Sequence, residues 1–154
     1  MAKLKIVTDP EFLRKPSKAV VDFDARLHTL LNDMRETLDA LNGVGLAAPQ
    51  VSVLLRVVLV KNGRGGNETI ELINPQIISQ TDFRDGEELC FSIVPMIPTI
   101  VNRAQKVTVA AQDRYGKPFT MEFRKLSAVC AAHEIDHLNG ILMTDRVGKA
   151  GASS

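Results

Sequence analysis

The most informative stretch of this chain, for its fold and for a possible ion-binding site, is Ala132-His133-Glu134-Ile135-Asp136-His137-Leu138-Asn139-Gly140. Residues four positions apart on an α-helix share one face, so His133 and His137 can reach the same ion. Glu134 then lies beside that ion, where a carboxylate can take a proton from an activated water. His-Glu-x-x-His on a helix is typical of metal-dependent hydrolases, although a surface helix with two solvated histidines has the same pattern.

The composition predicts one ordinary globular domain. The chain has 154 residues, of which 45% are hydrophobic and 24% charged, and its net charge of +1 favours neither nucleic acid nor a membrane surface. Its two cysteines, Cys90 and Cys130, form no disulfide framework and suit a reducing compartment in which thiolates bind metal. The first ten residues lack the apolar core of a signal peptide, and no apolar run reaches membrane-spanning length. We therefore expect a cytoplasmic location.

Apolar residues at helical spacing predict two helices. The first runs from Asp24, a suitable N-cap, to Leu41, and Gly43 follows its end. The second carries the two histidines and runs from about Ser127 to Asn139, with Gly140 as its stop. A short helical turn is also expected between two prolines, at residues 10–16.

Segments rich in branched residues predict strands between these helices. The expected strands are Arg56–Val60, Thr69–Ile73, Lys106–Gln112 and Pro118–Phe123. A flexible turn at 62–67 divides the first pair and a tighter turn at 113–117 joins the second. The fold class expected is α+β, with antiparallel strands packed around a central metal-binding helix and a long N-terminal helix. Residues 1–147 should form a single domain, and residues 148–154 a frayed tail.

A catalytic metal usually has three protein ligands, so His133 and His137 need a third. Cys130 shares their stripe, but it precedes His137 by about 10.5 Å along a helix axis, too far for so short a side chain. His28 lies beside the apolar stripe of the first helix and is interpreted as a residue at the edge of the core. Spacing therefore favours Cys90, which lies where a polar segment meets an apolar one, over Cys130.

A third segment of interest is Gly43-Val44-Gly45-Leu46-Ala47-Ala48-Pro49-Gln50. Its small residues predict a loop in which a ligand can approach the backbone closely, and Gln50 supplies an uncharged donor. The segment by itself does not indicate a ligand-binding site, because a glycine after a helix is most often a cap that ends the helix.

In this order, the three segments resemble the motifs of the peptide deformylase family, metal hydrolases that remove the formyl group from the N-terminal methionine of new polypeptides. The family motifs are Gly-x-Gly-x-Ala-Ala-x-Gln, Glu-Gly-Cys-Leu-Ser and Gln-His-Glu-x-Asp-His. The corresponding segments here are Gly43 to Gln50, Glu88-Leu89-Cys90-Phe91-Ser92 and Ala132 to His137. The similarity covers nearly the whole chain.

The resemblance implies one divalent ion bound by Cys90, His133 and His137. It favours Fe²⁺, while two imidazoles and a thiolate also suit Zn²⁺. It implies an N-formylmethionyl peptide as substrate, formate as product, and the ribosome near the nascent-chain exit as a candidate partner.

The resemblance also implies roles for residues around the ion. Glu134 matches the general base and acid of the family. The side chain of Gln50 and the backbone N–H of Phe91 match the donors to the formyl oxygen. Gly43, Val44, Gly45 and Leu89 are candidate substrate-binding residues.

The second motif departs from the family pattern. Leu89 replaces a glycine and Phe91 a leucine, so we expect a reshaped or narrowed substrate groove. Val94 is an extra residue before a proline, and Ala132 replaces a glutamine. The C-terminal helix of many bacterial members is expected to be absent. None of these changes removes a ligand or Glu134.

Two other features have alternative interpretations. Glu88 could orient His133 while paired with Arg103, or it could form a plain surface salt bridge. An apolar wall for a methionine-like side chain could come from residues that core packing explains equally well: Val44, Leu46, Phe91, Val129 and Ile135.

Three other functions also fit parts of the pattern. One is a deformylase paralogue with altered or weak activity on acylated peptides. Another is a metalloprotease, whose third ligand is normally a histidine or carboxylate downstream of the helix. The third is a non-catalytic binding protein stabilised by metal. Replacement of Cys90 separates the metalloprotease from the others, because a protease of this kind need not lose its ion.

Overall fold

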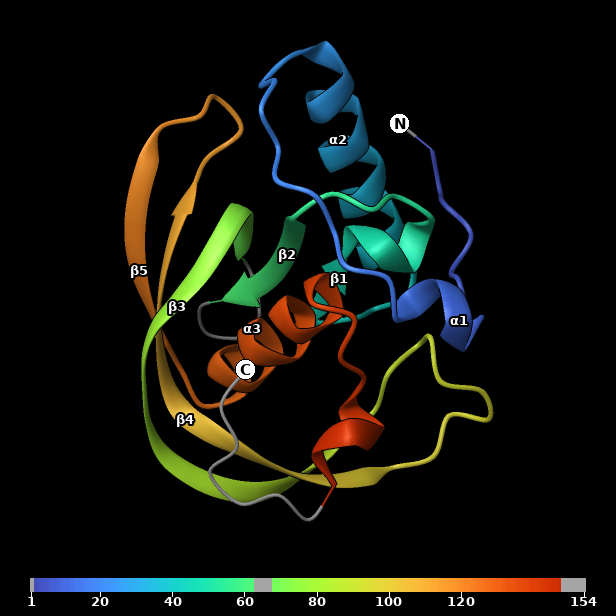
Figure 1. Ribbon diagram of the computed structural model, residues 1–154, viewed down its shortest axis with the longest axis vertical. Helices are drawn as coiled ribbons and strands as arrows, with labels where there is room; N and C mark the ends of the chain where they lie inside the picture. The colour runs from blue at the N-terminus through green and yellow to red at the C-terminus, as the bar shows by residue number, and fades with distance from the viewer. Residues whose placement is uncertain (1, 63–67, 148–154) are drawn as a thin grey trace.

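The computed structural model describes residues 2–62 and 68–147 and has the predicted α+β architecture (Figure 1). A strongly curved antiparallel sheet wraps around the helix that carries the two histidines, and a second long helix lies outside the sheet. The flexible turn predicted after Asn62 and the frayed tail predicted at 148–154 lie outside the residues that the structure describes.

The sheet has five strands in sequence order, and each pair of neighbours is antiparallel. The strands are β1 (Gly45–Ala47), β2 (Val57–Asn62), β3 (Glu68–Glu88), β4 (Thr99–Gln112) and β5 (Pro118–Arg124). The turn at 113–117 joins β4 and β5, as predicted, and Asp113 Oδ1 accepts the backbone N–H groups of Tyr115 and Lys117.

Strands β3 and β4 are much longer than their predicted segments, Thr69–Ile73 and Lys106–Gln112. The additional part of β3 is mostly exposed and polar, so it lacks the apolar alternation that indicates a strand. Register shifts between Ile73 and Gln76 and between Ile77 and Ser79 bend the pair. This bend lets the far end of β3 curve beneath the helix that carries the two histidines, where Glu88 ends the strand.

The helices are α1 (Pro10–Leu13), α2 (Ala25–Ala40) and α3 (Leu126–Leu138), with 3-10 helices η1 (Ala48–Val51) and η3 (Met143–Arg146). Asp24 caps α2 as predicted, because its side chain accepts the N–H of Leu27 at 3.1 Å. Gly140 follows α3 with a φ of +71°, and a Cβ there would clash with the carbonyl oxygen of Arg14. Glycine is therefore required where α3 ends.

Two large apolar clusters hold α3 and α2 against the sheet. The first joins the inner face of α3 to β2, β4 and β5, and includes Phe123, Ile135 and Leu138. The second joins α2 to β1, η1 and β2 through Leu31, Leu38 and their neighbours. Together the clusters fix α3 at the centre of the fold.

The glycine-rich segment is not the open loop that the sequence predicts. Gly45 to Ala47 form strand β1, which pairs with β2, and residues 48–51 form η1. A three-residue strand of glycine, leucine and alanine carries too little pattern to be recognised.

Within the described ranges, no helix is long and apolar enough to span a membrane.

Candidate metal centre and active site

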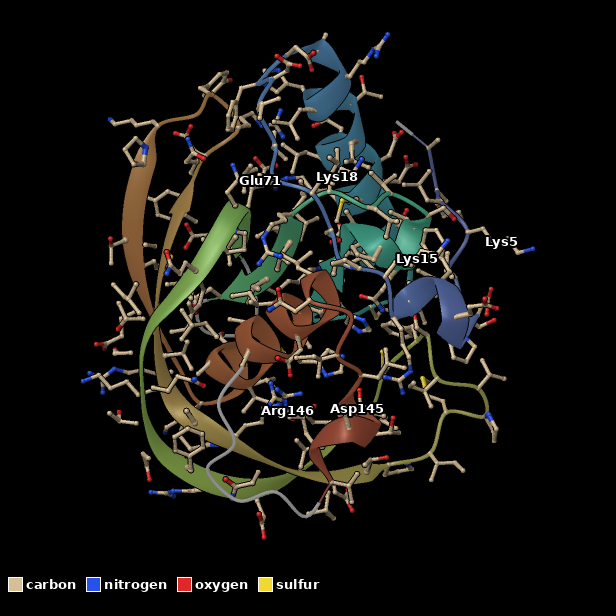
Figure 2. The ribbon with its side chains drawn as sticks, in the orientation of Figure 1. Lys5, Lys15, Lys18, Glu71, Asp145 and Arg146 are labelled. Carbon is tan, nitrogen blue, oxygen red and sulfur yellow. The ribbon has the colours of Figure 1, made fainter. Side chains whose placement is uncertain are left out.

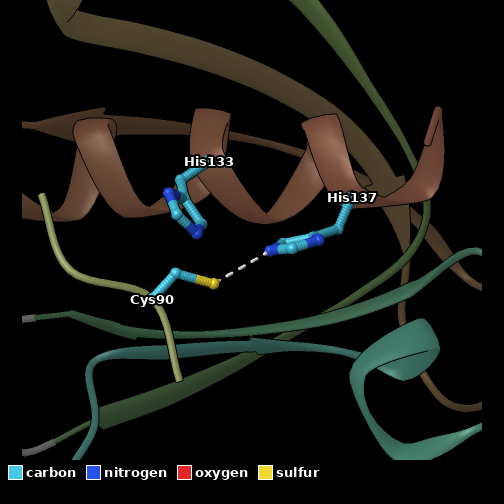
Figure 3. A group of neighbouring side chains, drawn as sticks. All are labelled: Cys90, His133 and His137. Carbon is cyan, nitrogen blue, oxygen red and sulfur yellow. Dashed lines mark hydrogen bonds between the residues drawn. The ribbon is translucent and has the colours of Figure 1, made fainter. Parts of the chain in front are cut away.

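The three predicted ligands lie together in the interior of the protein (Figure 3). His133 and His137 project from one face of α3, and Cys90 comes from the segment that follows β3. Their ligand atoms all lie within 4.8 Å of one another, and Cys90 Sγ is 3.4 Å from His137 Nε2. All three side chains are buried.

This arrangement fits a divalent ion. Zinc and similar ions bind thiolate sulfur at about 2.3 Å and imidazole nitrogen at about 2.0–2.1 Å, so ligand atoms a few ångströms apart can share one ion. The two imidazole rings have centroids 5.1 Å apart and planes inclined by 65°. A mixed nitrogen and sulfur donor set suits Fe²⁺ or Zn²⁺ better than a hard ion such as Mg²⁺.

The other two candidate ligands have different environments. Cys130 lies outside the ligand group, and burial, reinforced by the negative charge of Glu134, raises its thiol pKa to about 12. His28 Nε2 lies 2.8 Å from the carbonyl oxygen of Arg114, and the His28 ring packs edge-on against Tyr115. The structure therefore agrees with the interpretation of both as packing residues.

Glu88 contacts the metal ligand His133 directly. Its Oε1 lies 2.9 Å from His133 Nδ1, and its Oε2 accepts Arg103 Nε at 2.8 Å. Burial raises the pKa of Glu88, but hydrogen bonds from His133 and Arg103 outweigh it and leave the pKa below its ordinary value. The pair is therefore buried and oriented, which excludes the surface salt bridge interpretation.

Glu134 is buried beside the ligands. Its Oε1 has no hydrogen-bond partner among the residues the structure describes. Burial raises its pKa to about 7, Glu88 adds to the increase, and the positive charge of His133 opposes it. A carboxyl group with a pKa near neutrality can both accept and donate a proton at physiological pH.

Gln50 presents its amide nitrogen to the same space. The backbone N–H of Ala47 donates to Gln50 Oε1 at 3.0 Å, which fixes the orientation of the amide. Nε2 then lies 3.2 Å from Ser92 Oγ and 3.7 Å from Cys90 Sγ. The buried turn η1 thus aims a neutral donor at the ligand group.

A cavity of about 350 Å³ opens onto these groups. The predicted residues Gly43, Val44, Gly45, Leu89 and Phe91 all line it, together with Val129, Leu126 and Pro98. The side chain of Leu89 is 55% exposed. The ring of Phe91 packs against Gly43, where an added Cβ would lie 2.9 Å from Phe91 Cε2.

Two of the proposed apolar wall residues do not line this cavity. Leu46 is fully buried in the cluster beneath α2, and Ile135 belongs to the core between α3 and the sheet. Core packing therefore explains these two residues, because adjacent residues of a strand or helix point to different sides. Val44, Phe91 and Val129 line the cavity.

Sequence reasoning missed the ionic partners behind the ligands. Asp136 is fully buried and binds both Arg103 and Arg146. Asp136 lies inside the third motif, between the two histidines, and this position could have indicated a role at the site. Arg146 follows the helix by eight residues, in a segment whose composition does not indicate a functional residue.

Comparisons with known proteins agree with this geometry. The family described as Polypeptide deformylase matches residues 3–152. The peptide deformylase of Caldicellulosiruptor bescii is 49% identical over 148 residues, covering 96% of this chain and 87% of that protein. The peptide deformylase of Acetivibrio thermocellus is 51% identical over 137 residues, covering 89% of this chain and 78% of that protein.

Solved structures show the same relationship. The crystal structure of a peptide deformylase from Legionella pneumophila superposes with a TM-score of 0.89 at 46% identity, covering 96% of this chain and 88% of that one. The structure from Thermotoga maritima has a TM-score of 0.85 at 34% identity, with 96% and 98% covered. The chain therefore belongs to the polypeptide deformylase family and is a metal-dependent hydrolase with deformylase function.

Proposed function

We propose that Cys90, His133 and His137 hold one Fe²⁺ ion and that the residues around it hydrolyse the formyl group of N-formylmethionyl peptides. The observation that carries this proposal is the buried cluster of one sulfur and two imidazole nitrogens within 4.8 Å. The resemblance to deformylases favours Fe²⁺, and the donor set also accommodates Zn²⁺. When bound, such an ion acts as a Lewis acid that lowers the pKa of water and polarises a carbonyl oxygen.

Glu134 is the proton carrier of the proposed reaction. Its carboxylate takes a proton from the attacking water as the water oxygen bonds to the formyl carbon. It then gives that proton to the amide nitrogen as the carbon–nitrogen bond breaks, so that formate and a free amine leave. The burial of Glu134 beside the ligands, with an Oε1 that has no hydrogen-bond partner among the described residues, supports both transfers.

Gln50 and Phe91 stabilise the oxygen on which negative charge develops. Gln50 Nε2 faces the ligand group because Ala47 holds the other end of the amide. The backbone N–H of Phe91, the residue after Cys90, is the second donor. Donors fixed in advance in a dry site stabilise such charge more strongly than water does.

The cavity beside the ligands accommodates the methionine side chain. Its lining is mostly apolar, from Val44, Phe91 and Val129, and its size suits an unbranched side chain. Gly43, Gly45 and Leu89 contact the peptide backbone or its next residues. Because N-formylmethionine begins newly made polypeptides, we place the reaction in the cytoplasm, on chains that emerge from the ribosome.

The test is formate release from a panel of N-formylmethionyl peptides by anaerobic, iron-loaded protein. We expect turnover on formyl-Met peptides, none on N-acetyl peptides, and no cleavage of internal peptide bonds. Internal cleavage would instead identify a metalloprotease. Bound iron without formate release from any peptide would identify a binding protein.

Turnover that is slow on formyl-Met peptides but faster on another acylated end would identify a paralogue of altered specificity. Leu89 and Phe91 would then be the residues to examine, since both line the cavity and both depart from the family motif.

A further inference from the structure

The 3-10 helix η3 (Met143–Arg146) turns back beneath α3 after the chain leaves the metal helix (Figures 1 and 2). We propose that Arg146 is a positioning residue of the metal centre, which acts through Asp136, Arg103 and Glu88 on His133. This inference rests on the proposed ligand set, and it adds a residue outside all three family motifs.

The first link is a two-pronged ion pair. Arg146 Nη2 donates to Asp136 Oδ1 at 2.9 Å, and Arg146 Nε donates to Asp136 Oδ2 at 3.1 Å. Both side chains are nearly or completely buried, with exposed fractions of 9% and 1%. Bidentate pairs of this kind fix the direction as well as the distance of the carboxylate.

The second link joins the metal helix to the sheet. Arg103 on β4 donates from Nη1 to Asp136 Oδ2 at 2.6 Å and from Nε to Glu88 Oε2 at 2.8 Å. Glu88 in turn lies 2.9 Å from Nδ1 of His133, the ring nitrogen that is not needed by the ion if Nε2 binds it. A partner on that nitrogen sets the tautomer and the direction of a ligating imidazole.

The balance of buried charges explains how Arg146 can affect His133 without touching it. Two buried carboxylates, Glu88 and Asp136, alternate with two buried guanidinium groups, Arg103 and Arg146. Loss of Arg146 leaves Asp136 buried with only half of its cationic partners. Arg103 is then drawn toward Asp136 and away from Glu88, and Glu88 loses its fixed position on His133.

A separate apolar contact ties the same turn to the third ligand. Met143, also on η3, packs in a small buried cluster with Cys90 and Val101. Val147, the residue after Arg146, forms a bridge to Val101 on β4. The turn therefore supports Cys90 by packing and His133 by the ionic chain.

The experiment measures Zn²⁺ affinity by competition with a chelator and the visible absorption spectrum of the Co²⁺-loaded protein, in Arg146→Met and Arg146→Lys variants. Removal of a direct hydrogen-bond partner of a metal ligand typically weakens binding about 10–100-fold, and Arg146 acts on His133 through three other residues, so we expect an effect at the lower end of this range. We expect the methionine variant to bind Zn²⁺ about tenfold more weakly, with a shifted Co²⁺ spectrum. The lysine variant keeps the charge without the two-pronged geometry, so its loss should be smaller.

Arg14→Gln is the matched control. Arg14 forms a surface ion pair at 2.9 Å with Asp145, the neighbour of Arg146 on the same turn, without touching Asp136. It should leave Zn²⁺ affinity and the Co²⁺ spectrum unchanged. Equal loss of affinity in this control would show that general loosening of η3 is responsible and would overturn the proposal.

A purely structural role for Arg146 predicts a different result. In that case Arg146→Met lowers the unfolding midpoint of the metal-free protein while its Zn²⁺ affinity and Co²⁺ spectrum stay as in the wild type. If the methionine variant does not fold, wild-type affinity in Arg146→Lys overturns the proposal. Failure of the wild type to bind Zn²⁺ would instead refute the ligand set.

Discussion

Gly45 on β1 lies so close to Glu134 on α3 that a Cβ added to the glycine would be 2.7 Å from Glu134 Oε2 and 2.9 Å from its Cγ. The strand and the metal helix are therefore in contact at the position of the proposed proton carrier. Since the atoms that would clash belong to a side chain and not to the backbone, a larger residue at position 45 would displace the carboxylate before it disturbed the fold.

We expect Gly45→Ala to lower the rate of formate release by about a hundredfold, because a displacement of about 1 Å in a catalytic group has an effect of that size. The unfolding midpoint should change little. Gly86→Ala is the control, since a Cβ there meets nothing within 4 Å. The prediction fails if both variants are equally active, or if Gly45→Ala loses activity only by unfolding.

The two cysteines should respond differently to replacement. Cys90→Ala removes a proposed ligand. It should weaken metal binding by more than the roughly 10–100-fold loss that is typical when a residue hydrogen-bonded to a ligand is removed. Cys130→Ala should leave the metal stoichiometry at one ion per chain, because burial raises the pKa of this thiol to about 12 and keeps it protonated. Elemental analysis of both variants after dialysis checks this prediction. A metal-free Cys130→Ala protein, or a fully loaded Cys90→Ala protein, would contradict it.

The metal helix and its ligands could be predicted from the sequence, because their information is local or motif-like. The histidine spacing defines α3 and apolar periodicity defines α2. Spacing only favours Cys90 over Cys130, and it is the resemblance to the family that implies Cys90 as the third ligand. The resemblance then identified the family correctly.

The remaining parts depend on contacts between distant segments. The polar half of β3 forms a strand because β4 pairs with it, and its own residues do not alternate. The ion pairs of Asp136 join residues 33 and 10 positions apart along the chain. No local pattern specifies such partners, so Arg146 could be recognised only in three dimensions.

Glu71 on β3 should contribute to stability in a pH-dependent way (Figure 2). Burial raises its pKa, but hydrogen bonds from Arg114 and Arg35 outweigh it, so the folded-state pKa lies below the ordinary value of 4.5. A carboxyl group with a depressed folded-state pKa stabilises the protein above its unfolded-state pKa and loses that contribution as the pH falls through the folded-state value.

We therefore expect the unfolding free energy of the wild type to fall more steeply below about pH 4.5 than that of Glu71→Gln. At pH 7 the variant should be less stable, and the difference should shrink as the pH is lowered. Urea unfolding across this range measures both trends. Glu68→Gln, an exposed change on the same strand, is the control and should parallel the wild type. A constant difference between Glu71→Gln and wild type at all pH values would refute this account.

In the proposed reaction Glu134 transfers the proton at an ion held by Cys90, His133 and His137. Formate release by iron-loaded Glu134→Gln protein isolates this role, because glutamine keeps the shape of the side chain and removes the proton transfer. We expect one ion per chain, as in the wild type, with formate release from formyl-Met peptides at least about a hundredfold slower. An iron-loaded Glu134→Gln protein that releases formate at the wild-type rate would show that Glu134 is not the proton carrier.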